Sequence, residues 1–315
     1  MEKEHTLIVT SQEEGRRLDL FLAGKWPGMT RSRAQKLIAQ KYVLVNGEWR
    51  DKNYRLKEKE LVYVKIPPPK PLEAVPQPIP LQIVYEDRYL IVVNKPAGMV
   101  VHPAAGHREG TLVNALLAHC PGLMGINDDR IRPGMVHRLD KDTSGLLVVA
   151  KEERVVQLLS EQLKKRLVKR IYLALAKGNF QNSKGTIRLY IGRHPKDRKK
   201  MAVLEEGRGR IAVTHYKVLK EIKGYSLVWL LLETGRTHQI RVSLSHLGHP
   251  VVNDPVYGRR EKDLQGKGQL LHAYQLSFVH PCLGKEMTFK APLPDYFIEK
   301  LVKINYFLPS LLEEG

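Results

Sequence analysis

The chain has 315 residues, of which 52 are lysine or arginine and 33 are aspartate or glutamate, so that its net charge is +19; this length predicts one large and one small domain. It contains no apolar run of the roughly 18 residues that a transmembrane helix needs, and its charged, acidic start is unlike a secretory signal. The positive charge is spread through the chain and indicates a polyanionic partner, although charge alone does not distinguish RNA from DNA or an acidic membrane.

Residues 15–66 have the pattern of a compact unit in which two helices precede short strands. The first helix is predicted within 16–25, and the second, TRSRAQKLIAQ, is predicted to follow an N-cap at Thr30. The alternating segment VLVNGEW, with its Asn-Gly turn, and the later segment LVYVKI predict strands. The outward face of the second helix carries three basic residues: Arg31, Arg33 and Lys36.

Residues 67–80, PPPKPLEAVPQPIP, contain seven of the nineteen prolines. Proline removes a backbone donor and restricts φ, so this stretch is unsuited to a helix or to the interior of a sheet. It is predicted to be a semi-rigid linker between a small domain, residues 1–66, and a large domain, residues 81–315.

Strands and helices alternate beyond residue 80 without a regular βαβ rhythm. Strand patterns occur in 81–96, which reads as a hairpin, and in 144–151, 169–178 and 225–233. Helical patterns occur in 111–120, 153–166 and 237–248, the last with Thr237 as N-cap and Gly248 beyond its end. This mixture predicts an α+β fold with a mixed, largely antiparallel central sheet, flanking helices and a catalytic cleft, next to the small N-terminal α/β domain.

Seven polar or ionisable side chains crowd the segment VHRLDKDTSG, residues 136–145, immediately before an apolar strand. Loops held by a rigid strand often present reactive groups. Asp140 can act there as a nucleophile or a base, and Arg138 and Lys141 can bind phosphate. A surface turn in which Asp140 and Thr143 cap backbone groups explains the same pattern equally well.

A second polar cluster is TGRTHQIR, residues 234–241, which suits an anion or a carboxylate. A capped helix with a basic solvent face is the alternative, and Tyr172 taken alone is most simply a sheet aromatic. His238 is the best metal-ligand candidate, but no matching His or Glu spacing accompanies it, so no metal is expected. No nucleotide cofactor is expected either, because GxGxxG and Walker motifs are absent. Cys120 and Cys282 have no zinc-site spacing and fit a reduced cytoplasmic interior, although a disulfide between them stays open.

The segment HRLDKDTSGLLVVAK resembles the signature of the RluA-type RNA pseudouridine synthases. Three further segments support the resemblance in the expected order, namely 94–103, 170–172 and 235–241, and it extends over about residues 80–300. The segment VVHPAAGHREGTLVNALLAH is similar to the RluD-like subgroup, which modifies a hairpin of large-subunit ribosomal RNA. The N-terminal unit resembles a small RNA-binding domain first described in a small-subunit ribosomal protein.

This resemblance implies a cofactor-free isomerisation in which uracil is detached from C1′ of the ribose, turned and rejoined through C5. Asp140 matches the essential aspartate, which either attacks C1′ or takes the 2′ proton, and Arg241 matches the arginine that pairs with it. Tyr172 matches the aromatic that stacks on the flipped uracil, and Arg138 matches the arginine that fills the space left by the extruded base.

The implied partner is large-subunit ribosomal RNA, and Arg31, Arg33 and Lys36 are expected to contact its phosphates. We expect a cytoplasmic monomer without a membrane partner. A non-catalytic RNA-binding or ribosome-assembly factor would have the same charge and the same small domain. A hydrolase that uses Asp140 is less suited to the sequence, because a glycosidase normally needs two well-separated carboxylates and Asp142 is too close.

Overall fold

The structure is a computed structural model that describes residues 3–67, 73–104, 106–128, 130–197, 199–264 and 268–306. The chain divides into two compact units, residues 1–71 and 72–315, and each is described by itself. Residues 68–72 of the expected linker lie outside the described residues. The domain limits at 66 and 81 therefore stay a prediction.

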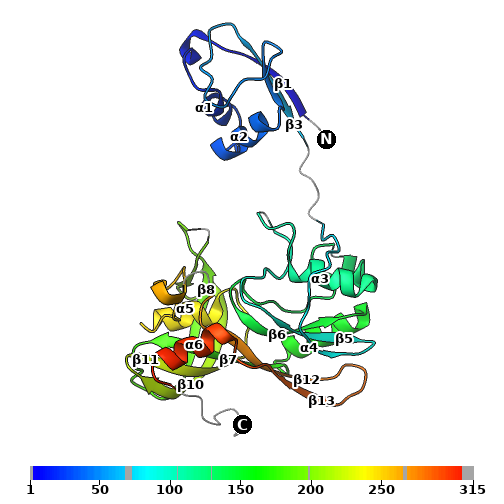
Figure 1. Ribbon diagram of the computed structural model, residues 1–315, viewed down its shortest axis with the longest axis vertical. Helices are drawn as coiled ribbons and strands as arrows, with labels where there is room; N and C mark the ends of the chain where they lie inside the picture. Colours follow the sequence, from blue (N-terminus) through cyan, green and yellow to red (C-terminus); the bar gives the residue numbers. More distant parts are fainter. Residues whose placement is uncertain are drawn as a thin grey trace. The chain divides into compact units, whose positions relative to one another are not determined.

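The smaller unit is a three-stranded antiparallel sheet with two helices (Figure 1). Its strands are β1 (Lys3–Ile8), β2 (Val43–Val45) and β3 (Leu61–Ile66), in the order β1-β3-β2. Its helices are α1 (Leu18–Ala23) and α2 (Arg31–Ala39), and a 3-10 turn covers Ser11–Glu13. The sequence analysis missed β1, because this edge strand, KEHTLI, is polar and has no buried residue.

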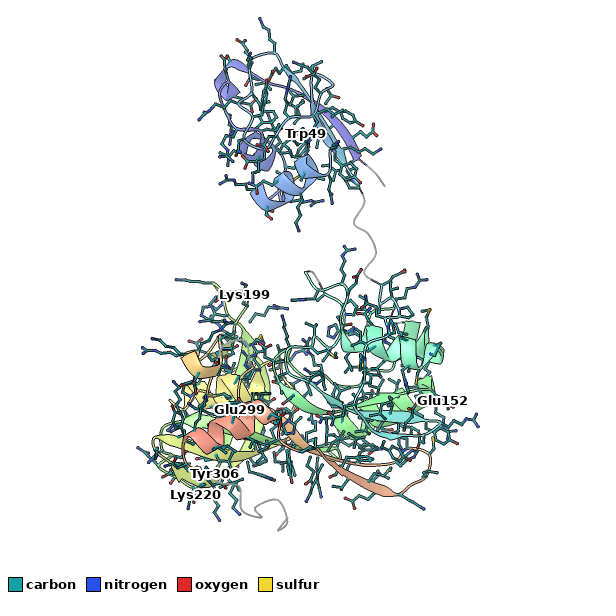
Figure 2. The ribbon with its side chains drawn as sticks, in the orientation of Figure 1. Trp49, Glu152, Lys199, Lys220, Glu299 and Tyr306 are labelled. Carbon is teal, nitrogen blue, oxygen red and sulfur yellow. The ribbon has the colours of Figure 1, made fainter. Side chains whose placement is uncertain are left out.

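The second helix of the small unit begins as its sequence predicts. The hydroxyl of Thr30 accepts a hydrogen bond from the backbone N–H of Arg33 at 3.2 Å, which satisfies one of the free donors at the helix start. Ala34, Leu37 and Ile38 are buried on its inner face. Trp49, labelled in Figure 2, donates its indole N–H to the carbonyl of Ile38 at 2.8 Å and so ties the following loop to the helix.

A ten-stranded sheet runs through the larger unit in the order β4-β5-β6-β12-β7-β11-β10-β8-β9, with β13 paired to β12. Neighbouring strands are antiparallel except β6 and β12, which are parallel. The expected mixed, largely antiparallel sheet is therefore confirmed. The strands are β4 (Ile83–Glu86), β5 (Leu90–Lys95), β6 (Ser144–Ala150), β7 (Lys169–Lys177), β8 (Lys184–Arg193), β9 (Met201–Leu204), β10 (Arg210–Ile222), β11 (Tyr225–Leu232), β12 (Leu271–Val279) and β13 (Glu286–Lys290).

The helices of the larger unit lie in two groups (Figure 1): α5 and α6 with β8, β10 and β11, and α3 and α4 with β5 and β6. They are α3 (Leu112–His119), α4 (Glu153–Lys164), α5 (Gln239–His246) and α6 (Asp295–Lys303), with 3-10 turns at Pro121–Leu123, Ile126–Asp128 and Lys262–Leu264. Among the described residues, no helix combines the length and the apolar character that crossing a bilayer would require.

One predicted helix start is wrong. The cap at Thr237 was expected from its side chain, but α5 begins at Gln239 and its N-cap is His238, in the left-handed conformation with φ 56°. Gln239 explains the shift, because its side-chain oxygen accepts the backbone N–H of Arg236 at 2.9 Å and holds the preceding turn. Gly248 does lie beyond the helix end, with φ 85°.

Strand β7 separates two apolar cores, because successive side chains of a strand point to opposite faces. Tyr172 and Ala174 belong to the core that includes β5, β6 and α3. Leu173 and Leu175 belong to a second core, which also contains Phe297 of α6. By the same alternation, position 170 lies on the face of Tyr172.

The described part of the proline-rich segment, residues 73–80, forms neither helix nor strand and is attached to the larger unit. The backbone N–H of Ala74 donates to the carbonyl of Arg130 at 2.9 Å, and Asn114 of α3 donates its side-chain amide to the carbonyl of Val75 at 2.7 Å. These residues therefore belong structurally to the larger unit.

Candidate active site

A cavity of about 560 Å³ opens in the larger unit, which is within the size range of ligand sites. Its walls come from the loop before β6, the end of α4, β7, the end of β11 and the turn that leads into α5. The lining residues are 136–140, Thr143, 163–164, Arg166, Arg170, Tyr172, 232–241 and Leu271. Both polar clusters of the sequence analysis therefore meet at this one cavity.

A buried lysine supports the loop that carries Asp140. Lys95 is only 1% exposed and donates to the carbonyls of Pro96, Met99 and Lys141 at 2.8, 2.9 and 3.0 Å. Burial lowers the pKa of Lys95 to about 7, opposed by the charges of Asp142 and Asp140, while the three carbonyls favour the ammonium form. This lysine connects the end of β5 to the Asp140 loop.

The segment before β12 closes the other side of the same loop. Gln269 donates its side-chain amide to the hydroxyl of Thr143 at 2.9 Å. A side chain at position 268 would meet the carbonyl of Asp142 at 2.3 Å, so only glycine allows this approach. Asp140 is thus presented by a loop that is fixed at both ends.

Arg241 brings the two clusters into contact. Its Nη1 donates to Oδ2 of Asp140 at 2.9 Å, and its Nε and Nη2 donate to the carboxylate of Asp254 at 2.7 and 2.9 Å. The side chains of Arg241 and Asp254 are 5% and 0% exposed, and that of Asp140 is 16% exposed. Asp140 and Arg241 both line the cavity, and the reactive candidate Asp140 is the most exposed member of this trio.

The charges of this trio stabilise one another against burial. Taking an ion from water into a protein costs several kcal/mol, so a lone buried guanidinium would be unstable. Burial acts to lower the pKa of Arg241, but the hydrogen bonds and charges of Asp254 and Asp140 raise it above its usual value. Burial likewise opposes ionisation of Asp254, yet the hydrogen bonds from Arg241 lower its pKa. Both stay charged at neutral pH.

A chain of hydrogen bonds holds His238 near Asp140. The backbone N–H of Met201 donates to the hydroxyl oxygen of Tyr257 at 2.7 Å, and that hydroxyl lies 2.8 Å from Nδ1 of His238. Nε2 of His238 is 3.9 Å from Oδ2 of Asp140. Burial lowers the pKa of His238 despite the opposing charge of Asp140, so the ring is neutral at pH 7. We assign its proton to Nε2, because Nδ1 then accepts the tyrosine O–H and the N–H faces the carboxylate.

Tyr172 lies in the wall of the cavity and is 6% exposed. Burial raises the pKa of its hydroxyl, with an opposing effect from Arg170 and a further rise from Asp140. Arg170 and Asp140 line the same cavity as this ring. An aromatic face beside a carboxylate suits a planar base.

Cations outnumber carboxylates in the cavity wall. The only carboxylates among the lining residues are Asp140 and Glu233, whereas the cations are Arg138, Lys164, Arg166, Arg170, Arg236 and Arg241. Arg138 is the exposed member of the Asp140 loop that lines the cavity. Arg166 forms an ion pair with Glu233. Such a wall attracts a polyanion.

The three basic residues expected to bind RNA on the small unit differ in their surroundings. Arg31 donates to Asp19 at 3.0 Å, and that carboxylate is fully buried and also bound by Arg17 and Gln35. Arg33 and Lys36 are exposed, and neither forms an ion pair with any described residue. Part of the charge of Arg31 is therefore neutralised within the unit.

One cluster with metal-ligand atoms, formed by Glu86, His119 and Cys120, occurs among the described residues and does not line the cavity. It offers three ligands, whereas structural zinc sites normally have four. The ammonium of Lys151 already lies 2.7 Å from Glu86 and occupies the place of a cation. This arrangement provides no argument for a metal centre.

The sequence analysis missed Asp254, Tyr257, Lys95 and Arg170. Asp254 and Tyr257 stand in the segment VVNDPVYG, where the only signal is an acidic residue before proline in apolar surroundings. Lys95 and Arg170 lie inside motifs already singled out, but each is one of many basic residues. Burial distinguishes them, and a single sequence does not show burial of a cation.

Comparison with known proteins shows what the whole chain is similar to. A family model described as RNA pseudouridylate synthase matches residues 89–246, and a model of the S4 domain matches residues 16–62. The chain is 48% identical to an uncharacterized RNA pseudouridine synthase of Synechocystis sp., over 94% of this chain and 91% of that protein. It is 45% identical to the ribosomal large subunit pseudouridine synthase D of Zymomonas mobilis, over 91% and 93% of the two chains. Among solved structures, human RNA pseudouridylate synthase domain containing 1 is similar, with a TM-score of 0.57 and 30% identity over 78% of this chain and 95% of that one.

Proposed function

Because the chain belongs to the RNA pseudouridylate synthase family, we propose that it converts specific uridines of large-subunit ribosomal RNA to pseudouridine with Asp140 as its catalytic carboxylate. The observation that carries this proposal is the 2.9 Å ion pair between Asp140 and Arg241, in the cavity that Tyr172 also lines. No external cofactor takes part in the proposed reaction.

The proposed reaction is an isomerisation. The bond between C1′ and N1 of the uridine breaks and a bond between C1′ and C5 forms, while a proton leaves C5 and one is gained at N1. Asp140 either forms an ester at C1′ or removes the 2′ proton, and both routes need it ionised. Arg241 serves both, because its Nη1 hydrogen bond to Oδ2 at 2.9 Å fixes the orientation of the carboxylate.

Tyr172 and Arg138 are proposed to hold the extruded nucleotide. Removing a base from its stack costs a few kcal/mol, which a stacking partner in the pocket and a side chain left in the helix both offset. The position of Tyr172 in the cavity wall supports the first role, and the exposed Arg138 two residues before Asp140 supports the second.

The S4-type unit is proposed to bind RNA phosphates through Arg33 and Lys36, with a smaller share from Arg31. Several relatives are named ribosomal large subunit pseudouridine synthase D, which supports ribosomal RNA as substrate. We also propose that the enzyme acts in the cytoplasm as a monomer and without a membrane partner.

The test is pseudouridine formation in an unmodified large-subunit ribosomal RNA transcript, without added metal or nucleotide. The parent protein should form product at discrete uridines. Asp140→Ala should form none while its affinity for the transcript changes little. Asp142→Ala is the matched control, because it removes a neighbouring carboxylate of the same loop that does not line the cavity. Conversion by Asp140→Ala near the parent rate would exclude Asp140 from the mechanism.

Deletion of the gene provides the test in cells. Loss of particular pseudouridines supports the synthase, and the lost sites identify the target uridines. An unchanged pseudouridine map combined with altered assembly of the large subunit would instead indicate a binding role without catalysis.

A further inference from the structure

Arg170 is a buried cation for which the proposed reaction has no role so far. It is 8% exposed, lines the cavity, and its Nε is buried without a hydrogen-bond partner. Within the described ranges its guanidinium has neither a hydrogen bond nor an ion pair. Arg241, in the same wall, has two carboxylate partners. A buried guanidinium without a counter-charge is unfavourable and calls for an explanation.

The surroundings of Arg170 provide space but no negative charge. A side chain at position 235 would come within 2.7 Å of Nη1 of Arg170, so the glycine there admits the guanidinium to the cavity wall. Burial and the charge of Arg170 lower the pKa of His137 to about 3, which keeps that imidazole neutral. The groups that enclose Arg170 thus leave its charge unbalanced.

Neither carboxylate of the cavity wall forms an ion pair with Arg170, and each is held by another residue. Asp140 is bound by Arg241 at 2.9 Å. Glu233 is bound by His215 at 2.6 Å and by Arg166. The counter-charge for Arg170 therefore has to come from a molecule that enters the cavity.

We propose that Arg170 binds a phosphate group next to the uridine that enters the cavity, and so fixes the ribose relative to Asp140. This inference rests on the proposed function and extends it by assigning a phosphate subsite. Arg170 and Tyr172 are two residues apart on one strand and share a face, so one nucleotide can reach both. The forked guanidinium matches phosphate oxygens. A phosphate carries a permanent charge, whereas uracil is neutral until its bond to the ribose breaks.

The variant Arg170→Met removes the charge and keeps an unbranched side chain. RNA binding is measured on an Asp140→Ala background between 50 and 200 mM salt, with the transcript fragment that the parent protein binds most tightly. The logarithm of the RNA association constant falls with the logarithm of the salt concentration. Loss of one phosphate contact should make this slope less steep by about 0.7, the value for single strands. Arg170→Lys should keep most of the slope. Arg154→Met is the control, because it removes an exposed cation at the start of α4 that does not line the cavity.

Thermal unfolding distinguishes a binding role from a structural one. Arg170→Met removes an uncompensated buried charge, so its melting temperature should equal or exceed that of the parent. Gly235→Ala is a second route to the same site, because it displaces the guanidinium without changing any charge. It should weaken RNA binding in the same direction, and it keeps the proposal testable if Arg170→Met does not fold.

Two results would overturn the phosphate subsite: an unchanged salt slope for Arg170→Met, or a marked fall in its melting temperature. An unchanged slope can also be accompanied by a slower reaction at saturating RNA, and this combination would place the contact on the uracil. These binding measurements need no turnover, so they test Arg170 even if the parent protein forms no pseudouridine and the proposed function fails.

Discussion

Replacing Asp254 by asparagine removes the fully buried negative charge that anchors Arg241. In the parent protein one oxygen of Asp254 accepts Nε of Arg241 at 2.7 Å, and the other accepts Nη2 at 2.9 Å and the N–H of Val256 at 2.8 Å. The side-chain oxygen of asparagine can still accept from Nη2 and from the N–H of Val256. Its NH₂ group then faces Nε of Arg241, and two donors cannot form a hydrogen bond with each other. One charged hydrogen bond is therefore lost, and the buried guanidinium of Arg241 keeps only Asp140 as its counter-charge.

Breaking a buried ion pair lowers the free energy of unfolding by about 3–5 kcal/mol. Because Arg241 keeps its hydrogen bond to Asp140, we expect a loss at the lower end of this range, about 3 kcal/mol. For a domain of 150–250 residues each kcal/mol shifts the melting temperature by about 2–4 °C, so Asp254→Asn should melt about 6–12 °C lower. Pseudouridine formation in a single turnover should slow by about 10²-fold, because misplaced catalytic groups lose that much.

The free energy of unfolding at low pH provides a second measure of the Asp254→Asn substitution. The pKa of Asp254 is lowered by folding, so the unfolded chain binds more protons in the window that extends downward from about pH 4. Stability from this group is present above that window and is lost as the pH falls through the folded pKa. Asp254→Asn should therefore show a shallower loss of stability in acid than the parent.

Calorimetry and a single-turnover assay measure both effects. Asp263→Asn is the control, because its carboxylate is 36% exposed and lies outside the cavity, where it pairs with Lys303 at 3.3 Å and with Lys300 at 3.8 Å. Exposed pairs contribute about 0–1 kcal/mol, so this change should cost less than Asp254→Asn. If Asp254→Asn melts within about 2 °C of the parent, the buried pair does not stabilise the site as argued. An undiminished rate would show that Arg241 needs no anchor.

Other changes test the remaining contacts. Lys95→Met leaves carbonyls under the Asp140 loop without a donor and should lower the free energy of unfolding by about 1–3 kcal/mol, measured by denaturant titration. Tyr257→Phe removes the neutral hydrogen bond to His238 and the acceptor of the Met201 N–H, and it should slow single-turnover conversion by about fivefold, with RNA affinity unchanged. Replacing Arg33 and Lys36 together by glutamine should reduce the salt slope of RNA binding by about 1.4, and an unchanged slope would remove the small unit from phosphate contact.

The sequence alone was sufficient for most elements and for the fold class. Apolar spacing at 3.6 or 2 residues predicted α2, α4, β6 and β7, because these elements bury a regular stripe or a full strand. It missed β1, a polar edge strand held by pairing to β3, and it gave no element for β8, β9, β10, β12, β13 or α6. It also misplaced the start of α5, where the side chain of Gln239 overrides the local signal of Thr237.

The motifs also identified Asp140, Tyr172, Arg138 and Arg241 as the candidates, and the structure places all four at one cavity. Which charges balance one another was beyond the sequence, because partners far apart in the chain meet only after folding. Tertiary structure alone decided that Asp254 holds Arg241, that Lys95 supports the Asp140 loop, and that Arg170 is buried without a counter-charge. The physical reason is that burial and pairing set the electrostatic free energy of an ion, and both depend on three-dimensional neighbours.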